Sequence, residues 1–562
     1  MRRRGNRVNE AAAKWPEDFA ERYRAEGYWQ GTTFSDFLRE RAHNFGDTTA
    51  IVDGVNRTSY AQLNRQASAL AGGLRELGIE QGDRVIIQLP NCGEFVTVWF
   101  ALQRLGAIPV HAQPGHRRAE IAHLARMTEA VAYVTTDLIG GFDHRALAAG
   151  VADSYPSIRA VLVVGDLGEY RGDSRFFSFA SVTHGDETGG LTGHLVTGSV
   201  SSSDVALLLL SGGTTGMPKL IARTHDDYLY NSRAAGERSR LDPSSIYLAV
   251  LPIAFNFTWN CPGILGTFYA GGTVVLSQSP DPAHCFELIE RERVTMTAIN
   301  PQLAPAWLAE KSFTNRDLSS LEILEIGSAR LSDHTAREIV ANFDCKLQQI
   351  LGMSEGLFCA NHLDDDVDIL CSAQGVPVSP ADEVRVVDEN GREVPNGEAG
   401  ELTTRGPYTL RGYWGAAELN DTAFTPDGFY RTGDLVRQSD SGHLTVVGRI
   451  KEQINRGGEK IAPAEVEGHL IAHPTIETVA VIGLPDNTLG ERTVAVVVTD
   501  GRAAPTRREL SVFLAEAGLA AYKSPDRVVR VDTMPLTPLG KIDKGAVRRL
   551  LEADTAAAVV SR

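Results

Sequence analysis

The chain has 562 residues, of which 43% are hydrophobic and 22% are charged, a composition typical of a folded globular protein. This length exceeds what one hydrophobic core usually organises, so we expect a large body and at least one smaller domain. The net charge of −16 argues against a nucleic-acid partner, because the electrostatic attraction that dominates such binding needs a basic surface.

The first ten residues, MRRRGNRVNE, carry positive charge without an apolar stretch behind them, so we expect neither a signal peptide nor an anchor. No stretch of the sequence resembles a transmembrane span, and no membrane partner is expected. The six cysteines are scattered, without the paired spacing of a zinc site or the density of a disulfide framework. These features favour a cytoplasmic protein.

An apolar run from Val205 to Leu210 predicts a buried strand, and a loop of glycines, hydroxyl side chains and one lysine follows it as far as Lys219. Glycines let the backbone approach an anion, while hydroxyls, backbone amides and a lysine contact its oxygens. The spacing is not that of a Walker A loop, and Pro218 before Lys219 removes the loop-to-helix entry of that motif. The loop predicts phosphate binding in another nucleotide fold, and an ordinary turn after a core strand is the alternative.

The middle of the chain alternates helical patterns with short apolar runs, which predicts parallel strands in α/β layers. The expected elements are a helix near His284–Arg293, a strand Val294–Asn300, a strand Leu321–Gly327, a helix near Asp333–Phe343 and a strand Lys346–Leu351.

From about Ala381 to Gly448 the runs become shorter and alternate between Gly, Pro and Asn turns, which predicts a β-rich subdomain. Beyond it, strands Thr478–Gly483 and Thr493–Thr499 and an amphipathic helix near Arg507–Gly518 predict a small α+β domain. We place the boundary near residue 450, which gives domains of residues 1–449 and 450–562.

The string from Ser211 to Lys219, SGGTTGMPK, resembles the phosphate loop of the adenylate-forming superfamily. That superfamily contains acyl- and aryl-CoA synthetases, nonribosomal-peptide adenylation domains and firefly-type luciferases. Similar strings follow in the family's order from about Thr33 to Arg549. The resemblance implies a large α/β domain of layered subdomains with a β-rich subdomain, a small mobile α+β domain, and a ligase that uses ATP and Mg²⁺. The ATP-binding residues that it implies are Ser211, Gly212, Gly213, Thr214, Thr215, Gly216, Lys219, Gly327, Gln349, Asp434 and Arg449, with Gln348 also beside adenine.

Two acidic residues match family positions and also suit nucleotide chemistry. Glu355, in the string from Gly352 to Gly356, offers one carboxylate among small residues, and the resemblance makes it the magnesium ligand. Asp434 stands at a turn, where a carboxylate can accept hydrogen bonds from both ribose hydroxyls. Without the family context, a solvated glutamate and an aspartate in a type I turn would be the plainer interpretations.

The string from Pro538 to Lys544 matches the segment that carries the family's adenylation lysine, so Lys541 is the catalytic candidate and Lys544 an ordinary lysine. An ammonium group there can neutralise charge while a carboxylate attacks the α-phosphate and pyrophosphate leaves. By resemblance, Lys451 is the hinge about which the small domain turns. Gly457 and Gly458 then form the face that the domain presents for thiol transfer.

The stretches Leu251–Gly263 and Ala222–Tyr228 most resemble the stand-alone aryl-acid AMP ligases of siderophore and related pathways. Asn256 is neutral where amino-acid adenylation domains carry an aspartate, and it can hydrogen-bond a phenolic 2-hydroxyl. His225 is a further catalytic candidate by the same resemblance. The aryl-acid pocket that the resemblance implies consists of Phe255, Asn256, Cys261, Ser328, Ile350 and Gly352.

Cys261 and Ile350 favour an acid of the salicylate type. Family members that use 2,3-dihydroxybenzoate have serine and valine at these positions, and a thiol is the poorer hydrogen-bonding group. Cys261 as a plain buried hydrophobe would give the same apolar lining. Phe255 stands where close relatives have histidine, Ser328 replaces a glycine, and Trp259 is expected to add bulk, so a methyl-, halo- or amino-salicylate is plausible. Ligases for 2,3-dihydroxybenzoate or an amino-hydroxybenzoate remain alternatives.

We expect the acceptor to be the phosphopantetheine thiol of an aryl carrier protein in siderophore or other natural-product biosynthesis. The main alternative is an aryl-CoA ligase that uses free coenzyme A. Three basic residues could serve a CoA 3′-phosphate or an acidic carrier helix equally well: Arg456, Lys460 and Arg492. A nucleotide-binding protein without catalysis would lack one of the four chemical residues Lys219, Glu355, Asp434 and Lys541, and all four are present. Both a monomer and a homodimer are compatible with the sequence.

Overall fold

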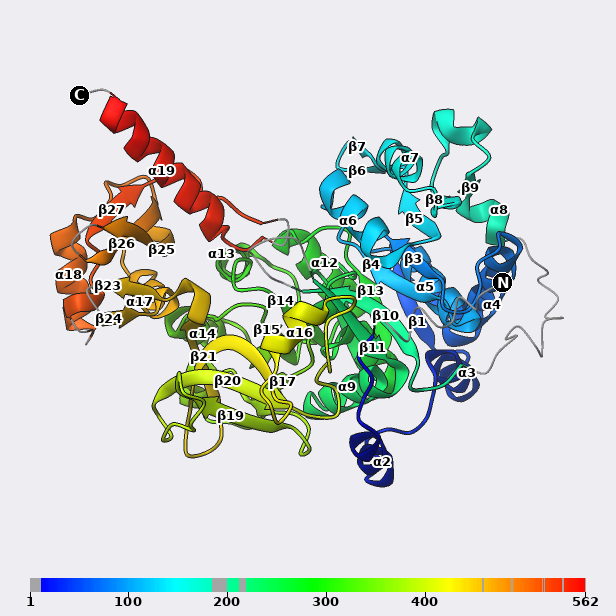
Figure 1. The fold of residues 1–562 in the computed structure, drawn as a ribbon, viewed down its shortest axis with the longest axis horizontal. Helices are drawn as coiled ribbons and strands as arrows, with labels where there is room; N and C mark the ends of the chain where they lie inside the picture. Colours follow the sequence, from blue (N-terminus) through cyan, green and yellow to red (C-terminus); the bar gives the residue numbers. More distant parts are fainter. Residues whose placement is uncertain are drawn as a thin grey trace.

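A computed structural model describes residues 12–183, 200–211, 219–456, 459–486, 489–517, 519, 521–537 and 540–560. Figure 1 shows most of the chain in one large body, with the orange and red C-terminal elements gathered at one end. This mixed α/β arrangement, a large N-terminal part and a small C-terminal part, confirms the predicted fold class.

The first large sheet has seven strands among the described residues, in the order β11-β10-β4-β3-β5-β8-β9. Neighbours are parallel except for the antiparallel pair β10 and β11. The strand predicted from Val205 to Leu210 is β10, and its burial on both faces explains the continuous apolar run. The strands are β3 (Arg84–Ile87), β4 (Ile108–His111), β5 (Ala132–Thr136), β8 (Ala160–Val164), β9 (Phe176–Ser178), β10 (Val205–Leu210) and β11 (Leu220–Thr224).

The second large sheet has nine described strands, in the order β18-β17-β16-β15-β14-β12-β13-β1-β2. Its central strands from β16 to β1 are parallel, as the alternating sequence pattern predicted. The strands are β1 (Thr49–Asp53), β2 (Asn56–Ser59), β12 (Ile246–Ala249), β13 (Thr273–Leu276), β14 (Met296–Ile299), β15 (Ile323–Ile326), β16 (Lys346–Gly352), β17 (Phe358–Ala360) and β18 (Val376–Pro377).

Helices between the two large sheets pack against both of them and supply one shared hydrophobic core. These inner helices are α3 (Phe34–Asn44), α4 (Tyr60–Glu76), α5 (Gly93–Leu105), α9 (His225–Arg238) and α11 (Gly263–Ala270). Helix α9 begins with a capping box, in which the Thr224 side chain accepts from the Asp227 N–H and the Asp227 side chain accepts from the Thr224 N–H.

Separate clusters cover the outer faces of the two sheets, so the large body has alternating helical and sheet layers. The outer helices are α6 (Arg118–Thr128) and α7 (His144–Ser154) on the first sheet, and α12 (Pro282–Glu292), α13 (Ala304–Phe313) and α14 (Asp333–Asn342) on the second. The predicted helices near His284–Arg293 and Asp333–Phe343 correspond to α12 and α14. Shorter elements are α2 (Glu17–Ala25), β6 (Leu138–Ile139), β7 (Phe142–Asp143), η1 (Gly168–Gly172), α8 (Phe179–Thr183), α10 (Asn256–Asn260) and α15 (Val367–Ser372).

The β-rich region predicted from about Ala381 to Gly448 forms a four-stranded antiparallel sheet with its own small core. Its elements are β19 (Glu383–Val387), β20 (Ala399–Arg405), α16 (Ala417–Ala423), β21 (Tyr430–Gln438) and β22 (Leu444–Arg449).

A single 3-10 turn, η2 (Ile450–Glu452), connects β22 to the first strand of the C-terminal sheet. The predicted C-terminal strands and helix are confirmed as β25, β26 and α18, which pack with β23, α17 and α19 around two further clusters. The elements are β23 (Ile454–Arg456), β24 (Glu459–Ile461), α17 (Pro463–Leu470), β25 (Ile476–Asp486), β26 (Gly490–Thr499), α18 (Arg507–Glu516), η3 (Ala521–Lys523), β27 (Arg527–Arg530) and α19 (Lys544–Val560). Among the described residues, the helices are all too short or too polar to cross a membrane.

Candidate active site

A cavity of about 560 Å³ lies where the end of the second large sheet, the β-rich sheet and the C-terminal region meet. Its volume suits a small-molecule site. The cavity brings together most of the residues that the sequence predicted: Ser211, Lys219, Phe255, Asn256, Cys261, Ser328, Ile350, Gly352, Glu355, Asp434, Arg449, Lys451 and Lys541.

Two hydrogen bonds between Ser211 and Lys219 join the two ends of the predicted phosphate loop. The Ser211 N–H donates to the Lys219 carbonyl at 2.9 Å, and the Lys219 N–H donates to Ser211 Oγ at 3.1 Å. Five of the predicted residues, Gly212, Gly213, Thr214, Thr215 and Gly216, lie outside the described residues. Lys219 Nζ lies 4.6 Å from the ring centroid of Tyr413, a cation–π contact that fixes the ammonium at the cavity wall.

Glu355 is buried at the cavity wall, and two tyrosines determine how its carboxylate is held. The Tyr413 hydroxyl donates to Glu355 Oε1 at 2.9 Å and lies 2.8 Å from the Tyr430 hydroxyl. Burial, reinforced by the charge of Glu355, raises the pKa of both phenols, so they stay protonated and can donate. One carboxylate oxygen is thereby oriented, and the other is available to a ligand in the cavity.

Glu355 could provide one protein ligand to a Mg²⁺ ion in the cavity. Among the described residues, no group of three or more His, Cys, Asp or Glu side chains converges on one point. A Mg²⁺ ion here would take one protein carboxylate and draw its other ligands from phosphate oxygens and water. Mg²⁺ usually binds nucleotides in this way, so the residues present fit the ion.

Asp434, Arg449 and Lys541 form an electrostatic cluster in the wall of the same cavity, near enough to Glu355 for its charge to act on Asp434 and Arg449. Arg449 Nε donates to Asp434 Oδ1 at 2.7 Å, and the Asp434 N–H donates to Thr432 Oγ1 at 3.0 Å. The sequence predicted a turn at Asp434, but Thr432 and Asp434 both lie within strand β21, where Asp434 pairs with Arg449 of β22. Burial raises the pKa of Asp434 to about 6, and Arg449 opposes this shift. Burial and then the positive charge of Arg449 lower the pKa of Lys541 to about 8, and Asp434 opposes that shift.

Lys541 reaches across from the C-terminal region to the large body. Its Nζ donates to the Ser328 carbonyl oxygen at 2.6 Å. Ser328 has a φ of +72°, a left-handed conformation that is uncommon for a residue with a side chain. A contact between two regions that meet only in the folded chain therefore forms part of the cavity wall.

Asn256 and Cys261 lie at the two ends of the short helix α10 and face the cavity together. Asn256 Nδ2 lies 3.6 Å from Cys261 Sγ, and the Tyr228 hydroxyl donates to Asn256 Oδ1 at 2.6 Å. Burial raises the pKa of Cys261 to about 12, so the side chain stays a thiol. Ile350, on β16, completes an apolar wall beside them.

Gln348, Gln349 and Gly327 do not line the cavity, contrary to the expected adenine contacts. Gln349 Nε2 donates to the Leu370 carbonyl, and Gln349 Oε1 accepts from Gln374 Nε2. Gln348 is likewise occupied by buried partners. At Gly327 an added Cβ would lie 2.9 Å from the Ile350 Cβ, so this glycine serves close packing.

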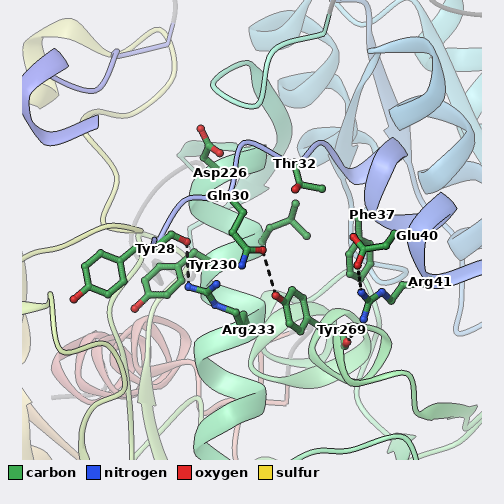
Figure 2. A pocket seen from close by; sticks show the side chains of 11 residues that line it. Tyr28, Gln30, Thr32, Phe37, Glu40, Arg41, Asp226, Tyr230, Arg233 and Tyr269 are labelled. Carbon is green, nitrogen blue, oxygen red and sulfur yellow. Dashed lines mark hydrogen bonds and ion pairs between the residues drawn. The ribbon is translucent and has the colours of Figure 1, made fainter. Parts of the chain in front are cut away.

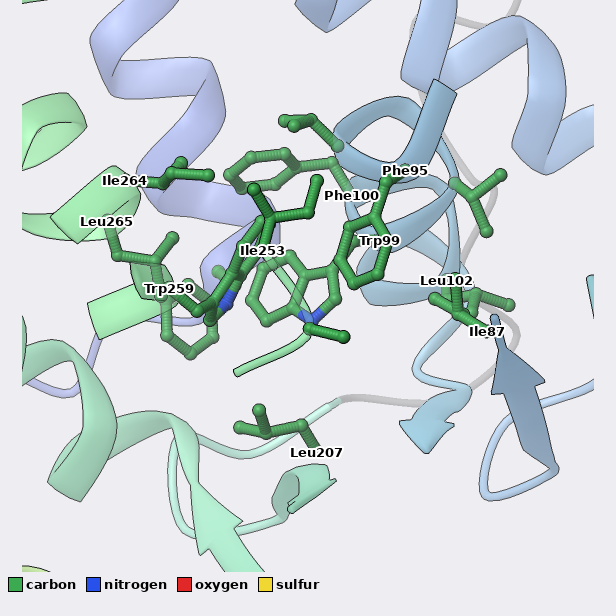
Figure 3. Close-up of a cluster of buried hydrophobic side chains, with 14 of the residues drawn as sticks. Ile87, Phe95, Trp99, Phe100, Leu102, Leu207, Ile253, Trp259, Ile264 and Leu265 are labelled. Atoms are coloured by element: carbon green, nitrogen blue, oxygen red, sulfur yellow. The ribbon is translucent and has the colours of Figure 1, made fainter. Parts of the chain in front are cut away.

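Trp259 does not add bulk to the cavity, which corrects the sequence-based expectation. Its ring is fully buried and packs 5.1 Å from Trp99 and 5.3 Å from Phe95, centroid to centroid. Figure 3 shows this aromatic cluster inside the core between the two large sheets. The local sequence could not show which way the Trp259 side chain points, because a short helix next to a pocket has one face toward the ligand and one toward the core.

His225 also lies outside the cavity. Its Nδ1 accepts the Phe34 N–H at 3.1 Å, at the start of α3. Burial lowers the pKa of His225 to about 3, so the ring is neutral and anchors one helix terminus to another. The geometry gives it a structural place and does not bring it to the predicted catalytic residues.

Two of the three basic residues that could bind a CoA 3′-phosphate or a carrier protein already form ion pairs with acidic residues of the chain. Arg456 makes two hydrogen bonds to Asp526 at 2.7 and 2.8 Å, and Arg492 lies 3.2 Å from Asp486. The side chain of Lys460, together with Gly457 and Gly458, lies outside the described residues.

Sequence reasoning missed the residues that hold the site residues in place. Tyr413 orients Glu355, and its signal was an aromatic residue next to a glycine in the string Arg411–Gly415. Arg223 is fully buried, pairs with Asp227 at 2.8 Å and donates to the Ser354 carbonyl at 3.1 Å, next to Glu355. The sequence offered no sign of either contact, because Arg223 lies on β11 while Asp227 lies on α9 and Ser354 is far away in the chain.

A second hollow, shown in Figure 2, lies between the segment before α3 and helices α9 and α11. It measures only about 50 Å³, too little for a nucleotide, and no residue that the sequence assigned to the site lines it. Arg233 and Arg41 there bond the carbonyls of Tyr28 and Tyr269, so the hollow is a packing feature.

Comparison with known proteins agrees with this geometry. The family model described as "AMP-binding enzyme" matches residues 38–414, and the "AMP-binding enzyme C-terminal domain" model matches residues 465–541. Among solved structures, the Mycobacterium smegmatis MbtA apo structure superimposes with a TM-score of 0.74 at 42% identity, covering 96% of this chain and 99% of that one.

Relatives with similar sequences extend over nearly the whole chain. A 2,3-dihydroxybenzoate-AMP ligase of Bacillus subtilis is 48% identical over 96% of this chain and 97% of its own. A salicyl-AMP ligase / salicyl-S-ArCP synthetase of Mycobacterium tuberculosis is 43% identical over 98% and 96%. A salicylyl-CoA synthase / salicylate adenylyltransferase of a Streptomyces species is 44% identical over 98% and 100%.

Proposed function

The chain belongs to the family of AMP-binding enzymes, and from this premise we propose that it activates a 2-hydroxybenzoate-type acid as its aryl-AMP and transfers the aryl group to a carrier-protein thiol. The acid is salicylate or a substituted salicylate, and the acceptor is the phosphopantetheine arm of an aryl carrier protein in natural-product or siderophore biosynthesis.

One observation carries the proposal. Lys219, Glu355, Asp434 and Lys541, which come from four distant segments, line the same cavity as Asn256 and Cys261. A binding protein without catalysis would have no need to bring a buried lysine of the C-terminal region to the wall of an aryl pocket. Such convergence of charged groups in one cavity is what an adenylation site requires.

We assign ATP to the side of the cavity that holds the charged residues. The phosphate loop between Ser211 and Lys219 receives the phosphates, and the Asp434 carboxylate accepts hydrogen bonds from the ribose hydroxyls, with Arg449 keeping Asp434 ionised. The acid lies on the apolar side, against Ile350 and Ser328, with its ring edge near Cys261.

Adenylation begins when the Lys541 ammonium lies between the acid's carboxylate and the α-phosphate. A carboxylate oxygen attacks the α-phosphorus, the bond from phosphorus to the oxygen bridging the β-phosphate breaks, and pyrophosphate leaves with the electron pair. Lys541 neutralises the charge that accumulates on the α-phosphate oxygens. Mg²⁺, held by Glu355 together with the phosphates, would supply positive charge to the triphosphate.

The second reaction transfers the aryl group from AMP to sulfur. The thiol sulfur attacks the acyl carbon, the bond from that carbon to the AMP oxygen breaks, and AMP leaves while the thiol proton passes to solvent. We take η2, with Lys451, as the hinge about which residues 450–562 turn between the two reactions, so that Gly457 and Gly458 face the site for this step.

All six cysteines are free, which suits a reducing compartment such as the cytoplasm.

The proposal is tested by ATP–pyrophosphate exchange over a panel of substituted benzoates. The adenylate formed with the best acid is then offered to free coenzyme A and to an aryl carrier protein. Exchange that requires a 2-hydroxybenzoate, followed by transfer to the carrier protein, is the expected result. If none of the 2-hydroxybenzoates supports exchange, the assignment of the acid is wrong. If the aryl group is transferred preferentially to coenzyme A, then coenzyme A and not the carrier protein is the acceptor.

A further inference from the structure

We propose that Tyr228 is a positioning residue that holds the Asn256 amide with its NH₂ group toward the cavity, so that the site selects benzoates whose ortho substituent accepts a hydrogen bond. This inference rests on the proposed function and names the chemical property that the enzyme recognises beside the carboxylate. It assigns a role to a residue that does not itself line the cavity.

Tyr228 is fully buried on α9, directly behind the cavity wall. Its hydroxyl donates to Asn256 Oδ1 at 2.6 Å. The ring is held from the other side by Arg223, whose guanidinium carbon lies 4.8 Å from the ring centroid and which is itself paired with Asp227. Tyr228 therefore has little freedom to move its hydroxyl elsewhere.

Helix α10 is fixed to α9 in a second place, one turn beyond Asn256. Asn260 Nδ2 bonds the Tyr228 carbonyl oxygen at 3.3 Å and Asn231 Oδ1 at 3.1 Å. Residues four apart on a helix lie on the same face, so this clamp keeps Asn256 over the Tyr228 hydroxyl.

The orientation of the Asn256 amide follows from the single proton of the Tyr228 hydroxyl. Burial raises the pKa of this phenol well above its ordinary value, so it keeps its proton and needs an acceptor. The amide oxygen is that acceptor. If the amide turned over, its NH₂ group would face the phenol and the phenol proton would lose its partner.

With the oxygen committed to Tyr228, Asn256 offers the cavity only N–H donors. One of them points toward Cys261 Sγ at 3.6 Å, a weak acceptor, which leaves donor capacity for a ligand. An ortho hydroxyl suits this arrangement, because its proton can bond the neighbouring carboxylate of the same acid while its oxygen accepts from Asn256. An ortho amino group would bring N–H donors against N–H donors, which costs binding energy.

The test compares kcat/KM for ATP–pyrophosphate exchange with 2-hydroxybenzoate, 2-aminobenzoate and unsubstituted benzoate. The unaltered enzyme is expected to prefer 2-hydroxybenzoate over 2-aminobenzoate by on the order of 100-fold. In Tyr228→Phe the amide is free to turn, and this preference should fall by about tenfold or more, the effect of one net hydrogen bond. The kcat/KM for unsubstituted benzoate should change by less than about threefold, because this acid has no ortho group that could accept a hydrogen bond from the Asn256 amide.

Tyr230→Phe is the matched control, because Tyr230 lies on the same helix and its buried hydroxyl bonds Ser379 Oγ at 2.7 Å, away from the cavity. It should lose a comparable hydrogen bond and keep the preference of the unaltered enzyme. Asn256→Asp supplies a second variant that replaces the donor by an acceptor and should reverse the preference toward 2-aminobenzoate. A purely structural role for Tyr228 would lower all three rates together and leave the ratio unchanged.

An unchanged ratio in Tyr228→Phe, with 2-hydroxybenzoate still activated by the unaltered enzyme, overturns this inference and leaves the proposed function intact. If Tyr228→Phe does not fold, as thermal unfolding would show, Asn256→Asp decides by whether the preference reverses. Failure of every benzoate to support exchange in the unaltered enzyme would overturn the proposed function and the inference with it.

Discussion

The Nζ atom of Lys541 donates a hydrogen bond to the carbonyl oxygen of Ser328 at 2.6 Å, which brings the C-terminal region to the wall of the aryl pocket. This conformation is the one that the proposed function requires for the first reaction, with the lysine at the cavity wall. The ammonium also lies near Asp434 and Arg449, whose opposite charges shift its pKa in opposite directions.

Replacing Lys541 by alanine should remove adenylate formation and spare thiol transfer. The loss of one preorganised cation at the reacting phosphate lowers kcat for ATP–pyrophosphate exchange by about 100- to 1,000-fold. Transfer from a supplied aryl-AMP to the thiol should persist, because Lys541 takes part only in the first reaction. Lys346→Ala, an exposed lysine outside the cavity, is the control. Equal loss of both reactions would contradict the assignment.

The rate of adenylation should depend on pH with two limbs. Asp434 must be ionised, and its pKa of about 6 means that activity falls as pH drops below that value. Lys541 must be protonated, and its pKa of about 8 means that activity falls as pH rises above that value. The measurement is kcat/KM against pH, which reports groups of the free enzyme.

Lys541→Arg separates the two limbs, because a guanidinium stays charged throughout this range. The alkaline limb should move upward in that variant while the acid limb stays in place. An alkaline limb that is unchanged would mean that another group is responsible for it.

Tyr413→Phe should weaken the use of Mg²⁺. The hydroxyl that orients Glu355 is lost, and loss of such an orienting partner typically costs about tenfold or more in metal affinity. A titration of Mg²⁺ at fixed ATP gives the half-saturating concentration, which should rise accordingly. Tyr430→Phe keeps the bond from Tyr413 to Glu355 and should change this concentration much less. Identical Mg²⁺ curves for the unaltered enzyme and Tyr413→Phe would refute the role of Tyr413.

Cys261→Ser should shift the choice of acid toward 2,3-dihydroxybenzoate. A hydroxyl in place of the buried thiol can bond a 3-hydroxyl, which should raise the ratio of kcat/KM for 2,3-dihydroxybenzoate over salicylate by about tenfold. Cys285→Ser makes the same chemical change at a buried cysteine outside the cavity and serves as control. An unchanged ratio would show that Cys261 does not face the 3-position.

Lys451→Pro should spare adenylation and impair thiol transfer. Lys451 lies in η2, and proline would restrict the backbone rotation that a hinge needs. The two reactions are measured separately, as exchange and as transfer to the carrier protein. If exchange is lost to the same degree as transfer, Lys451 is not the hinge.

The sequence by itself determined the fold class, the central elements and the family. A continuous apolar run predicted β10, shorter apolar runs predicted β15 and β16, and helical periodicity predicted α12, α14 and α18, because these signals depend on residues close together in the chain. The strings around Lys219, Glu355, Asp434 and Lys541 predicted the charged residues that line the cavity. Chemistry of this kind can be read from local sequence because it needs particular residue types at particular spacings.

Only the tertiary structure decided which side chains face the cavity and what holds them there. Trp259, Gln349 and His225 lie in matching segments but point into the core, because packing of distant segments sets the direction of a side chain. Neither Tyr413 nor Tyr228 was assigned a role from the sequence, yet they orient Glu355 and Asn256. A hydrogen bond between residues far apart in the chain exists only after folding has brought them together, and so the sequence named the reacting groups while the fold determined their partners.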